Sequence, residues 1–254
     1  MQHEETEDYR GIISHMLNGN CSVNTKGCGK TRGWKIQRKT GEFKMKHISI
    51  IDDDIHIGNV IEEALMPFQY TWDEIEQHVT VCTQCPLSRT RKRPVMGRGS
   101  HQADIMLIAE APGGQEDAQG IPFVGRSGEI LDNLLRDCGL GREEIYITNI
   151  VKCRPPGNRD PEDWEKEACF PYLKYETFLL RPQIIVCLGR IAAQRIISPD
   201  FKITRQHGTW TYRKNCALTA TYHPSAILRD ASKYEAVRAD FCEVVKKRVA
   251  YNRQ

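Results

Sequence analysis

The sequence predicts an α/β fold in which a parallel sheet is covered by helices on both faces. Short apolar runs, of the length expected for strands buried on both faces, alternate with longer segments of helical periodicity. Four such strand–helix units follow one another after residue 71. Strands that alternate with helices imply parallel pairing, and the crossovers between them should be right-handed.

Residues 1–70 differ from the rest and are expected to form an N-terminal extension of unknown role, in front of a domain at residues 71–254. A basic stretch alternates weakly around Thr40-Gly41, which predicts a hairpin. Cys21 and Cys28 could be a zinc pair, but their spacing fits no common ligand pattern, so free thiols are the better interpretation.

The signals sharpen from Thr71, which can cap a helix with Glu74 as its capping-box partner. The predicted strands are residues 104–109, 145–150, 183–188 and 216–221. The predicted helices are residues 127–138, closed by Gly139, a helix that begins at Pro161, residues 190–197 and residues 232–249.

The composition is that of a soluble globular protein, with 40% hydrophobic and 27% charged residues in 254. A net charge of +3 permits a nucleic-acid surface without arguing for one. No apolar run approaches membrane-spanning length, so no membrane partner is expected, and the acidic start is no secretory signal. The expected location is therefore cytoplasmic, where ten cysteines are unlikely to form a disulfide framework.

Metal or cluster ligation is the better explanation for part of this cysteine content. Cys82 and Cys85 form a C-x-x-C pair, Cys153 follows the second strand, and Cys169 lies on the next helix. Four thiolates suit an iron–sulfur cluster or a structural zinc, and the residues alone leave both open. Three other cysteines fall on apolar faces or strands and are expected in the core: Cys138, Cys187 and Cys242.

Polar residues end three of the four predicted strands. Glu110 follows the first, within a stretch rich in glycine and acids, and Asn149 and His223 end the second and fourth. Each could be an ordinary turn or loop residue. Together they ring the carboxyl edge of a parallel sheet, where ligand pockets form, and Phe123 offers a stacking face beside them.

Three long motifs then point to a family. A-E-A-P-G-G-Q-E-D-A-Q-G-I-P-F-V-G-R-S-G, T-N-I-V-K-C-R-P-P-G-N-R and Y-H-P-S-A-I-L-R, together with four matching cysteines, closely resemble family 4 uracil-DNA glycosylases over roughly residues 71–251. These are the iron–sulfur members of the uracil-DNA glycosylase superfamily. The resemblance implies a DNA repair enzyme that hydrolyses the N-glycosidic bond of uracil, and a three-layer α/β/α sandwich around a four-stranded parallel sheet. It also implies a [4Fe–4S] cluster held by Cys82, Cys85, Cys153 and Cys169.

The same resemblance assigns roles around the base. Phe123 should stack on uracil, Asn149 should read its edge, Glu116 should exclude thymine at C5, and His223 should face the O2 carbonyl. The pocket walls should include Ala109, Glu110 and Ala111. The residues expected to act in catalysis are Glu110, Asp117 and His223, with one of the two acids positioning the water. The basic residues expected at DNA phosphates are Arg98, Arg154, Arg159 and Arg229. The expected partner is uracil-containing DNA, single- or double-stranded, bound by a monomer.

One departure from the family keeps an alternative open. Ala109 stands where the family usually has glycine, and its methyl group could crowd the pocket floor. The alternative function is a non-catalytic or weakly catalytic protein of the same fold that binds uracil-containing DNA. A third hypothesis is a zinc-bound DNA-binding protein without a base pocket. It would leave the grouping of Glu110, Asn149 and His223 at the strand ends as a coincidence.

Overall fold

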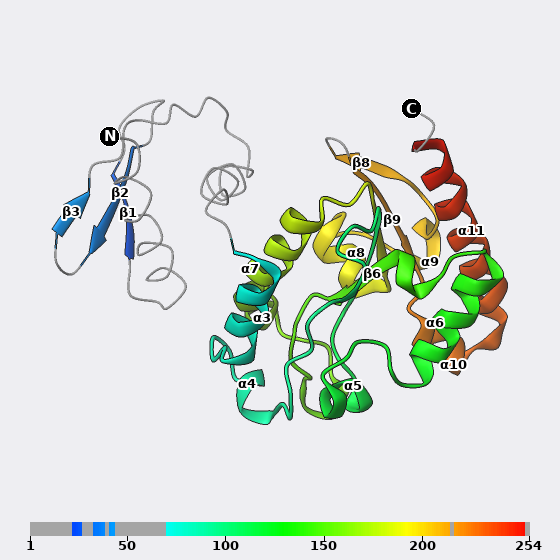
Figure 1. Cartoon of the computed structure of the whole chain (residues 1–254), viewed down its shortest axis with the longest axis horizontal. Helices are drawn as coiled ribbons and strands as arrows, with labels where there is room; N and C mark the ends of the chain where they lie inside the picture. Colours follow the sequence, from blue (N-terminus) through cyan, green and yellow to red (C-terminus); the bar gives the residue numbers. More distant parts are fainter. Residues whose placement is uncertain (1–21, 27–32, 39–40, 44–69, 214–215, 252–254) are drawn as a thin grey trace. The chain divides into compact units, whose positions relative to one another are not determined.

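The computed structural model describes residues 22–26, 33–38, 41–43, 70–213 and 216–251, and the chain divides into two units, Met1–Gln69 and Tyr70–Gln254 (Figure 1). The strands of the first unit are β1 (Ser22–Lys26), β2 (Gly33–Arg38) and β3 (Gly41–Phe43), antiparallel and in that order. β2 and β3 pair Arg38 with Gly41, which confirms the predicted hairpin. Cys21 and Cys28 lie outside the described residues.

The second unit is built on a six-stranded sheet of order β4-β6-β5-β7-β9-β8. Its strands are β4 (Arg98–Gly99), β5 (Ile105–Ala109), β6 (Ile145–Asn149), β7 (Ile184–Leu188), β8 (Thr211–Arg213) and β9 (Cys216–Thr221). The four predicted strands are the parallel centre, β6-β5-β7-β9. The sheet is wider than predicted because β4 and β8 add antiparallel edges, and strands of two or three residues show no readable periodicity.

Helices follow the parallel strands as predicted. They are α3 (Trp72–Thr80), α4 (Leu87–Thr90), α5 (Gly114–Gln119), α6 (Arg126–Asp137), α7 (Asp163–Leu180), α8 (Arg190–Ile196), α9 (Ile203–Gln206), α10 (Pro224–Arg229) and α11 (Tyr234–Tyr251), with short 3₁₀ turns η1 (Arg142–Glu144), η2 (Pro156–Asn158) and η3 (Ala231–Lys233). The Thr71 capping box is confirmed, since Thr71 N donates to Glu74 Oε2 at 2.7 Å and Glu74 N to Thr71 Oγ1 at 3.3 Å. Four short helices, α4, α5, α9 and α10, were not predicted, and α7 begins two residues after Pro161.

The sheet is covered on both faces because its strands alternate between two apolar layers. In β5, Ile105, Leu107 and Ala109 pack against α6, α10 and α11, whereas Met106 and Ile108 pack against α7 and α8. All five residues are at most 1% exposed. This is the expected three-layer sandwich, and it leaves the ends of the strands as the place where polar groups can gather.

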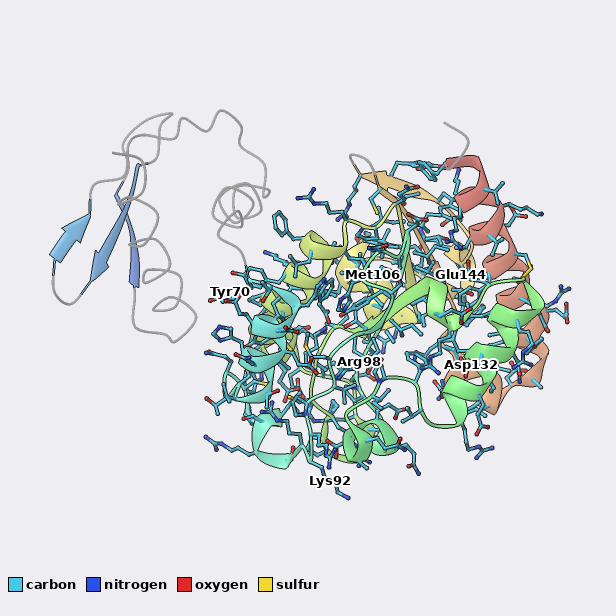
Figure 2. The ribbon with its side chains drawn as sticks, in the orientation of Figure 1. Tyr70, Lys92, Arg98, Met106, Asp132 and Glu144 are labelled. Atoms are coloured by element: carbon cyan, nitrogen blue, oxygen red, sulfur yellow. A yellow bond between two sulfur atoms is a disulfide. The ribbon has the colours of Figure 1, made fainter. Side chains whose placement is uncertain are left out.

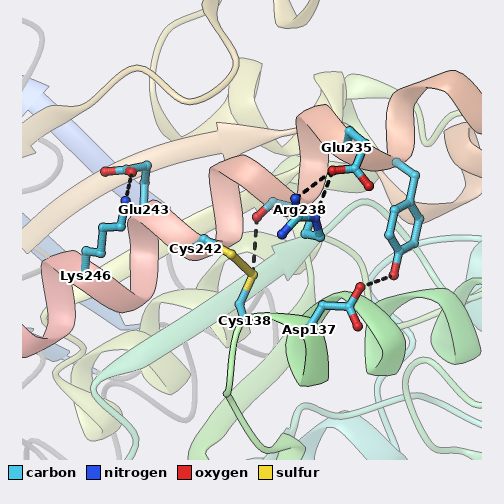
Figure 3. The surroundings of a disulfide bond; sticks show 8 residues. Asp137, Cys138, Glu235, Arg238, Cys242, Glu243 and Lys246 are labelled. Atoms are coloured by element: carbon cyan, nitrogen blue, oxygen red, sulfur yellow. Dashed lines mark hydrogen bonds and ion pairs between the residues drawn. A yellow bond between two sulfur atoms is a disulfide. The ribbon is translucent and has the colours of Figure 1, made fainter.

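Two cysteines expected in the core instead form a disulfide. Cys138 follows the last turn of α6, and Cys242 lies on α11, 104 residues further along the chain (Figure 3). The sequence interpretation was wrong because an apolar helix face and a disulfide both place cysteine between packed helices. Only the packing of α6 on α11 brings these Cα atoms to 5.0 Å. Cys187 is fully buried in the core, as predicted.

Within the described part of the chain, no helix is both long enough and apolar enough to cross a bilayer.

Candidate active site

A cleft of about 550 Å³ lies beyond the carboxyl ends of β5, β6, β7 and β9. Parallel strands end at one edge, so residues far apart in the sequence meet there. The predicted residues that line this cleft are Glu110, Ala111, Glu116, Phe123, Asn149, Arg159, His223 and Arg229. The structure therefore brings together most of the residues that the motifs singled out.

Asn149 ends β6 with its side chain in the cleft and only 2% of its surface exposed. Its side-chain amide makes no hydrogen bond with a described residue, although buried amides nearly always have a partner. Its backbone oxygen accepts from Lys152 Nζ at 2.9 Å, and that ammonium is also paired with Glu176 at 2.6 Å in a fully buried ion pair. The end of β6 is therefore held in place, while the side-chain amide of Asn149 is available to bind a ligand.

His223 is fixed as a neutral donor. It precedes α10, and its Nδ1 accepts from the backbone N–H of Ser225 at 3.1 Å. Because that ring nitrogen accepts, the neutral ring carries its proton on Nε2. Burial, helped by the positive charge of Arg229, lowers the pKa of His223 to about 4, so the ring stays neutral near pH 7.

Glu110 carries the most perturbed carboxyl of the cleft. Burial and the neighbouring charge of Asp160 raise its pKa to about 7, while Arg190 and Lys166 oppose that shift. Arg190 is itself paired with Asp160 at 2.6 Å. A carboxyl that is partly ionised at neutral pH in a ligand cleft is suited to proton transfer or to holding a water.

Phe123 and Glu116 form one wall. The Phe123 ring lies 5.6 Å from the His223 ring, centroid to centroid, with 29° between their planes. Glu116 Oε1 accepts from the backbone N–H groups of Val124 and Gly125 at 3.1 and 3.0 Å. Its carboxylate therefore both lines the cleft and ties α5 to the loop that carries Phe123.

Other predicted site residues lie elsewhere. Ala109 is fully buried in the apolar layer of α6, α10 and α11, which also contains Phe123, and it is not among the residues that line the cleft. Asp117 is 2% exposed, and its Oδ1 accepts from Lys92 N at 2.8 Å. Arg98, labelled in Figure 2, is on edge strand β4 and pairs with Glu76 at 2.8 Å.

The arginines predicted to bind phosphate differ in the side chains with which they already form hydrogen bonds or ion pairs. Arg154 stands beside the cleft and donates to Asn158, a lining residue, at 2.7 Å. Arg159 makes a two-pronged pair with the buried Glu165, at 2.9 and 2.7 Å. Arg229, in the last turn of α10, forms no hydrogen bond or ion pair with a described residue and faces the cleft.

Sequence reasoning missed several lining residues: Ser127, Asp160, Arg190, Tyr222 and Ser225. A signal was present for Arg190, since Gly189-Arg190 directly follows β7, the one parallel strand for which no polar end residue was predicted. Asp160 had no comparable signal, because only the path of the loop after β6 brings it beside Glu110.

A second cavity is lined by all four candidate ligand cysteines: Cys82, Cys85, Cys153 and Cys169. No group of His, Cys, Asp or Glu among the described residues converges as ligands of a single metal ion would. Thiolates around a cubane cluster each bind a different iron, so they line a cavity instead of meeting at a point. Four thiolates that line one cavity are the donor set of an iron–sulfur cluster.

Hydrogen bonds to the two buried sulfurs support this site. Arg91 Nη1 donates to Cys153 Sγ at 3.0 Å, and the Lys152 amide donates to Cys169 Sγ at 3.2 Å. Hydrogen bonds of this kind surround metal-bound thiolates in proteins and tune the group they hold. The cavity thus has the donor set and the surroundings of a cluster site.

Comparison with known proteins agrees with this geometry. The family model of the uracil DNA glycosylase superfamily matches residues 96–249. The type-4 uracil-DNA glycosylase of Archaeoglobus fulgidus is 39% identical over 180 residues, which cover 68% of this chain and 90% of that protein. The proteins of the same name from Sulfurisphaera tokodaii and Thermotoga maritima are 40% and 39% identical, over 68% and 64% of this chain and 82% and 88% of their own lengths. With the strand-end cleft and the four-cysteine cavity in the same unit, the chain belongs to the uracil DNA glycosylase superfamily and, within it, to the type-4 uracil-DNA glycosylases.

Proposed function

We propose that this protein removes uracil from DNA by hydrolysing the bond between the base and deoxyribose, which leaves an abasic site. The observation that carries the proposal is the meeting of an unpaired Asn149 amide, a neutral His223 and the Phe123 ring in one cleft. These three groups suit a flat, polar base. A base inside a duplex cannot reach such a cleft, so it must first leave the stack.

Asn149 supplies the selection of uracil over cytosine. Its amide can accept from uracil N3–H and donate to O4, whereas cytosine exchanges the donor and acceptor at these two positions. Because Asn149 is held at the end of β6, each mismatch with cytosine would leave a buried polar group unpaired. Each such group costs roughly 1–3 kcal/mol of binding free energy. Phe123 holds the plane of the base, and Glu116 occupies the space that the thymine methyl group would need.

His223 and Glu110 support the reaction. As the bond breaks, the sugar gains oxocarbenium character and uracil gains negative charge. The Nε2–H of His223 donates to the O2 carbonyl, where that charge develops. Glu110, when ionised, orients the water that captures the sugar. Asp117 is not given this role, because its carboxylate accepts from Lys92 outside the cleft.

DNA binding at the rim involves Arg229 above all, since its guanidinium has no partner among the described residues. Arg154 and Arg159 lie on the loop after β6, and their hydrogen bonds to Asn158 and Glu165 order that loop at the cleft. We propose that the protein works as a monomer.

Cys82, Cys85, Cys153 and Cys169 are proposed to hold a [4Fe–4S] cluster. When bound, the cluster would cross-link the loop before α4, the loop after β6 and α7. Its role would be structural, because hydrolysis transfers no electron. Purified protein should contain iron and absorb broadly in the visible range. Stoichiometric zinc without iron would contradict the assignment.

A single assay tests the central proposal. An oligonucleotide with one uracil is incubated with the protein and then treated with alkali, which cuts at abasic sites. Strand scission is expected, and His223→Ala should reduce its rate by roughly 10²–10³-fold if His223 acts as one oxyanion-type donor. A shift in DNA mobility without scission would indicate a binding protein instead.

A further inference from the structure

The aromatic wall of the cleft has an unusual backbone. Phe123 has a φ of 55°, in the left-handed region that bulky residues avoid, and its side chain is 6% exposed. Such a conformation persists only where surrounding contacts fix it. The groups that fix it therefore decide where the ring stands.

Arg142 is one such group, and it contacts the Phe123 carbonyl directly. Its Nη2 donates to the carbonyl oxygens of Pro122 and Phe123, at 2.7 and 2.9 Å, and its Nη1 donates to both carboxylate oxygens of Asp132, at 3.2 and 3.3 Å. Asp132, labelled in Figure 2, lies on α6, whereas Arg142 begins the 3₁₀ turn η1. One guanidinium thus joins the Phe123 loop to two fixed elements.

Two further contacts define the same loop. Glu116 accepts from the amides of Val124 and Gly125, directly after Phe123. The Phe123 carbonyl also packs against Gly128 so closely that a Cβ there would lie 1.9 Å from its oxygen. The loop is thus held by Glu116, which lines the cleft, and by Arg142, which is not itself a lining residue.

We propose that Arg142 is a positioning residue for base stacking, which fixes the plane of the Phe123 ring through the two backbone carbonyls. The inference rests on the proposed function. A planar guanidinium can serve two carbonyls and a carboxylate at once, whereas a lysine ammonium is a point charge without that fork. The Arg142 side chain is 36% exposed, and surface pairs such as that with Asp132 stabilise folds little, so its main effect falls on the loop.

The test is a double-mutant cycle between Arg142 and Phe123. Arg142→Ala should lower the single-turnover rate of uracil release by about 10- to 100-fold, since a small misplacement of a positioning group can cost that much. Phe123→Ala should also be slow. If Arg142 acts through the ring, the double variant Arg142→Ala/Phe123→Ala should be no slower than Phe123→Ala alone.

Arg136→Ala is the matched control, because Arg136 is exposed on the same helix as Asp132, and its side chain donates to Asn133 and to no other described residue. It should match the wild type, and affinity for undamaged duplex DNA should be unchanged in all variants. Arg142→Lys keeps the charge but loses the fork, so its rate should fall between the wild type and Arg142→Ala. This variant also keeps the cycle usable if Arg142→Ala fails to fold.

The outcomes separate the two proposals. If the wild type releases no uracil, the proposed function fails. If the wild type is active but the effects of the Arg142 and Phe123 variants multiply, or Arg142→Ala and Arg142→Lys both match Arg136→Ala, then the positioning role alone is overturned.

Discussion

The raised pKa of Glu110 predicts how the excision rate depends on pH. Burial and Asp160 raise its pKa to about 7. A carboxyl that orients water works in its ionised form, so the excision rate should rise with pH through about 7 and then level off. Glu110→Gln should be slower and lack this rise. Single-turnover rates from about pH 5 to about pH 9 would check the profile.

Asp160→Asn is the informative companion variant. Removing the Asp160 charge takes away one cause of the raised pKa and leaves the opposing Arg190 in place, so the rising limb should move to lower pH. If the rising limb of Asp160→Asn stays at the pH of the wild-type limb, a group other than Glu110 controls the rate.

Asn149 and Glu116 are expected to differ in what they exclude. Asn149→Ala should lower uracil excision sharply without admitting thymine, because it removes the hydrogen bonds to the base. Glu116→Ala should admit thymine detectably but also slow uracil release, because it frees the amides of Val124 and Gly125. Matched oligonucleotides with uracil, thymine or cytosine at one position measure both effects. Thymine release by Asn149→Ala but not by Glu116→Ala would mean that the two walls are assigned the wrong way round.

At the scale of elements, one arginine connects separate segments around the four-cysteine cavity. Arg91 donates to Cys153 Sγ and, through Nη2, to the carbonyl oxygens of Thr80 and Cys82, at 2.9 and 3.0 Å. It therefore links the C-x-x-C loop to the loop after β6. Arg91→Ala should lose iron faster in the presence of a chelator, measured as decay of visible absorbance. Arg89→Ala, at an exposed neighbouring position, should retain iron like the wild type.

The disulfide should stabilise the packing of α6 on α11. Closing a loop of about 100 residues restricts the unfolded chain, and removal of such a link typically costs about 2–4 kcal/mol. The double variant Cys138→Ser/Cys242→Ser should therefore melt at a lower temperature, as followed by circular dichroism. Its iron content should be unchanged, since both residues lie on the other face of the sheet from the four-cysteine cavity. Loss of iron would contradict that separation.

At the scale of the whole molecule, the cleft and the cavity are built entirely from Tyr70–Gln254. A protein comprising residues 70–254 should fold, retain its iron and release uracil. Iron content and the alkali assay would check this expectation. An unfolded or iron-free product would refute the boundary, whereas slower turnover alone would suggest that the basic N-terminal segment helps to hold DNA.

Much of the second unit could be predicted because the relevant signals are local. Apolar runs marked the four parallel strands, and the Thr71 capping box marked the start of α3. The carboxyl ends of parallel strands lie at one edge of the sheet, so the sequence alone predicts Glu110, Asn149 and His223 in one cleft. The family followed from three motifs in the correct order.

Only the tertiary structure shows which distant segments of the chain contact each other. The local sequence of one segment does not identify its partner. Nothing near Cys138 in the sequence points to Cys242, and nothing near Phe123 points to Arg142. The face of the sheet on which Ala109 lies depends on the phase of β5, and that phase places its methyl group in the apolar layer of α6, α10 and α11. Hydrophobic periodicity thus determined which elements form and at which edge they present polar groups. Packing determined which charges meet, because opposing side chains are brought together by the fold and not by their distance along the chain.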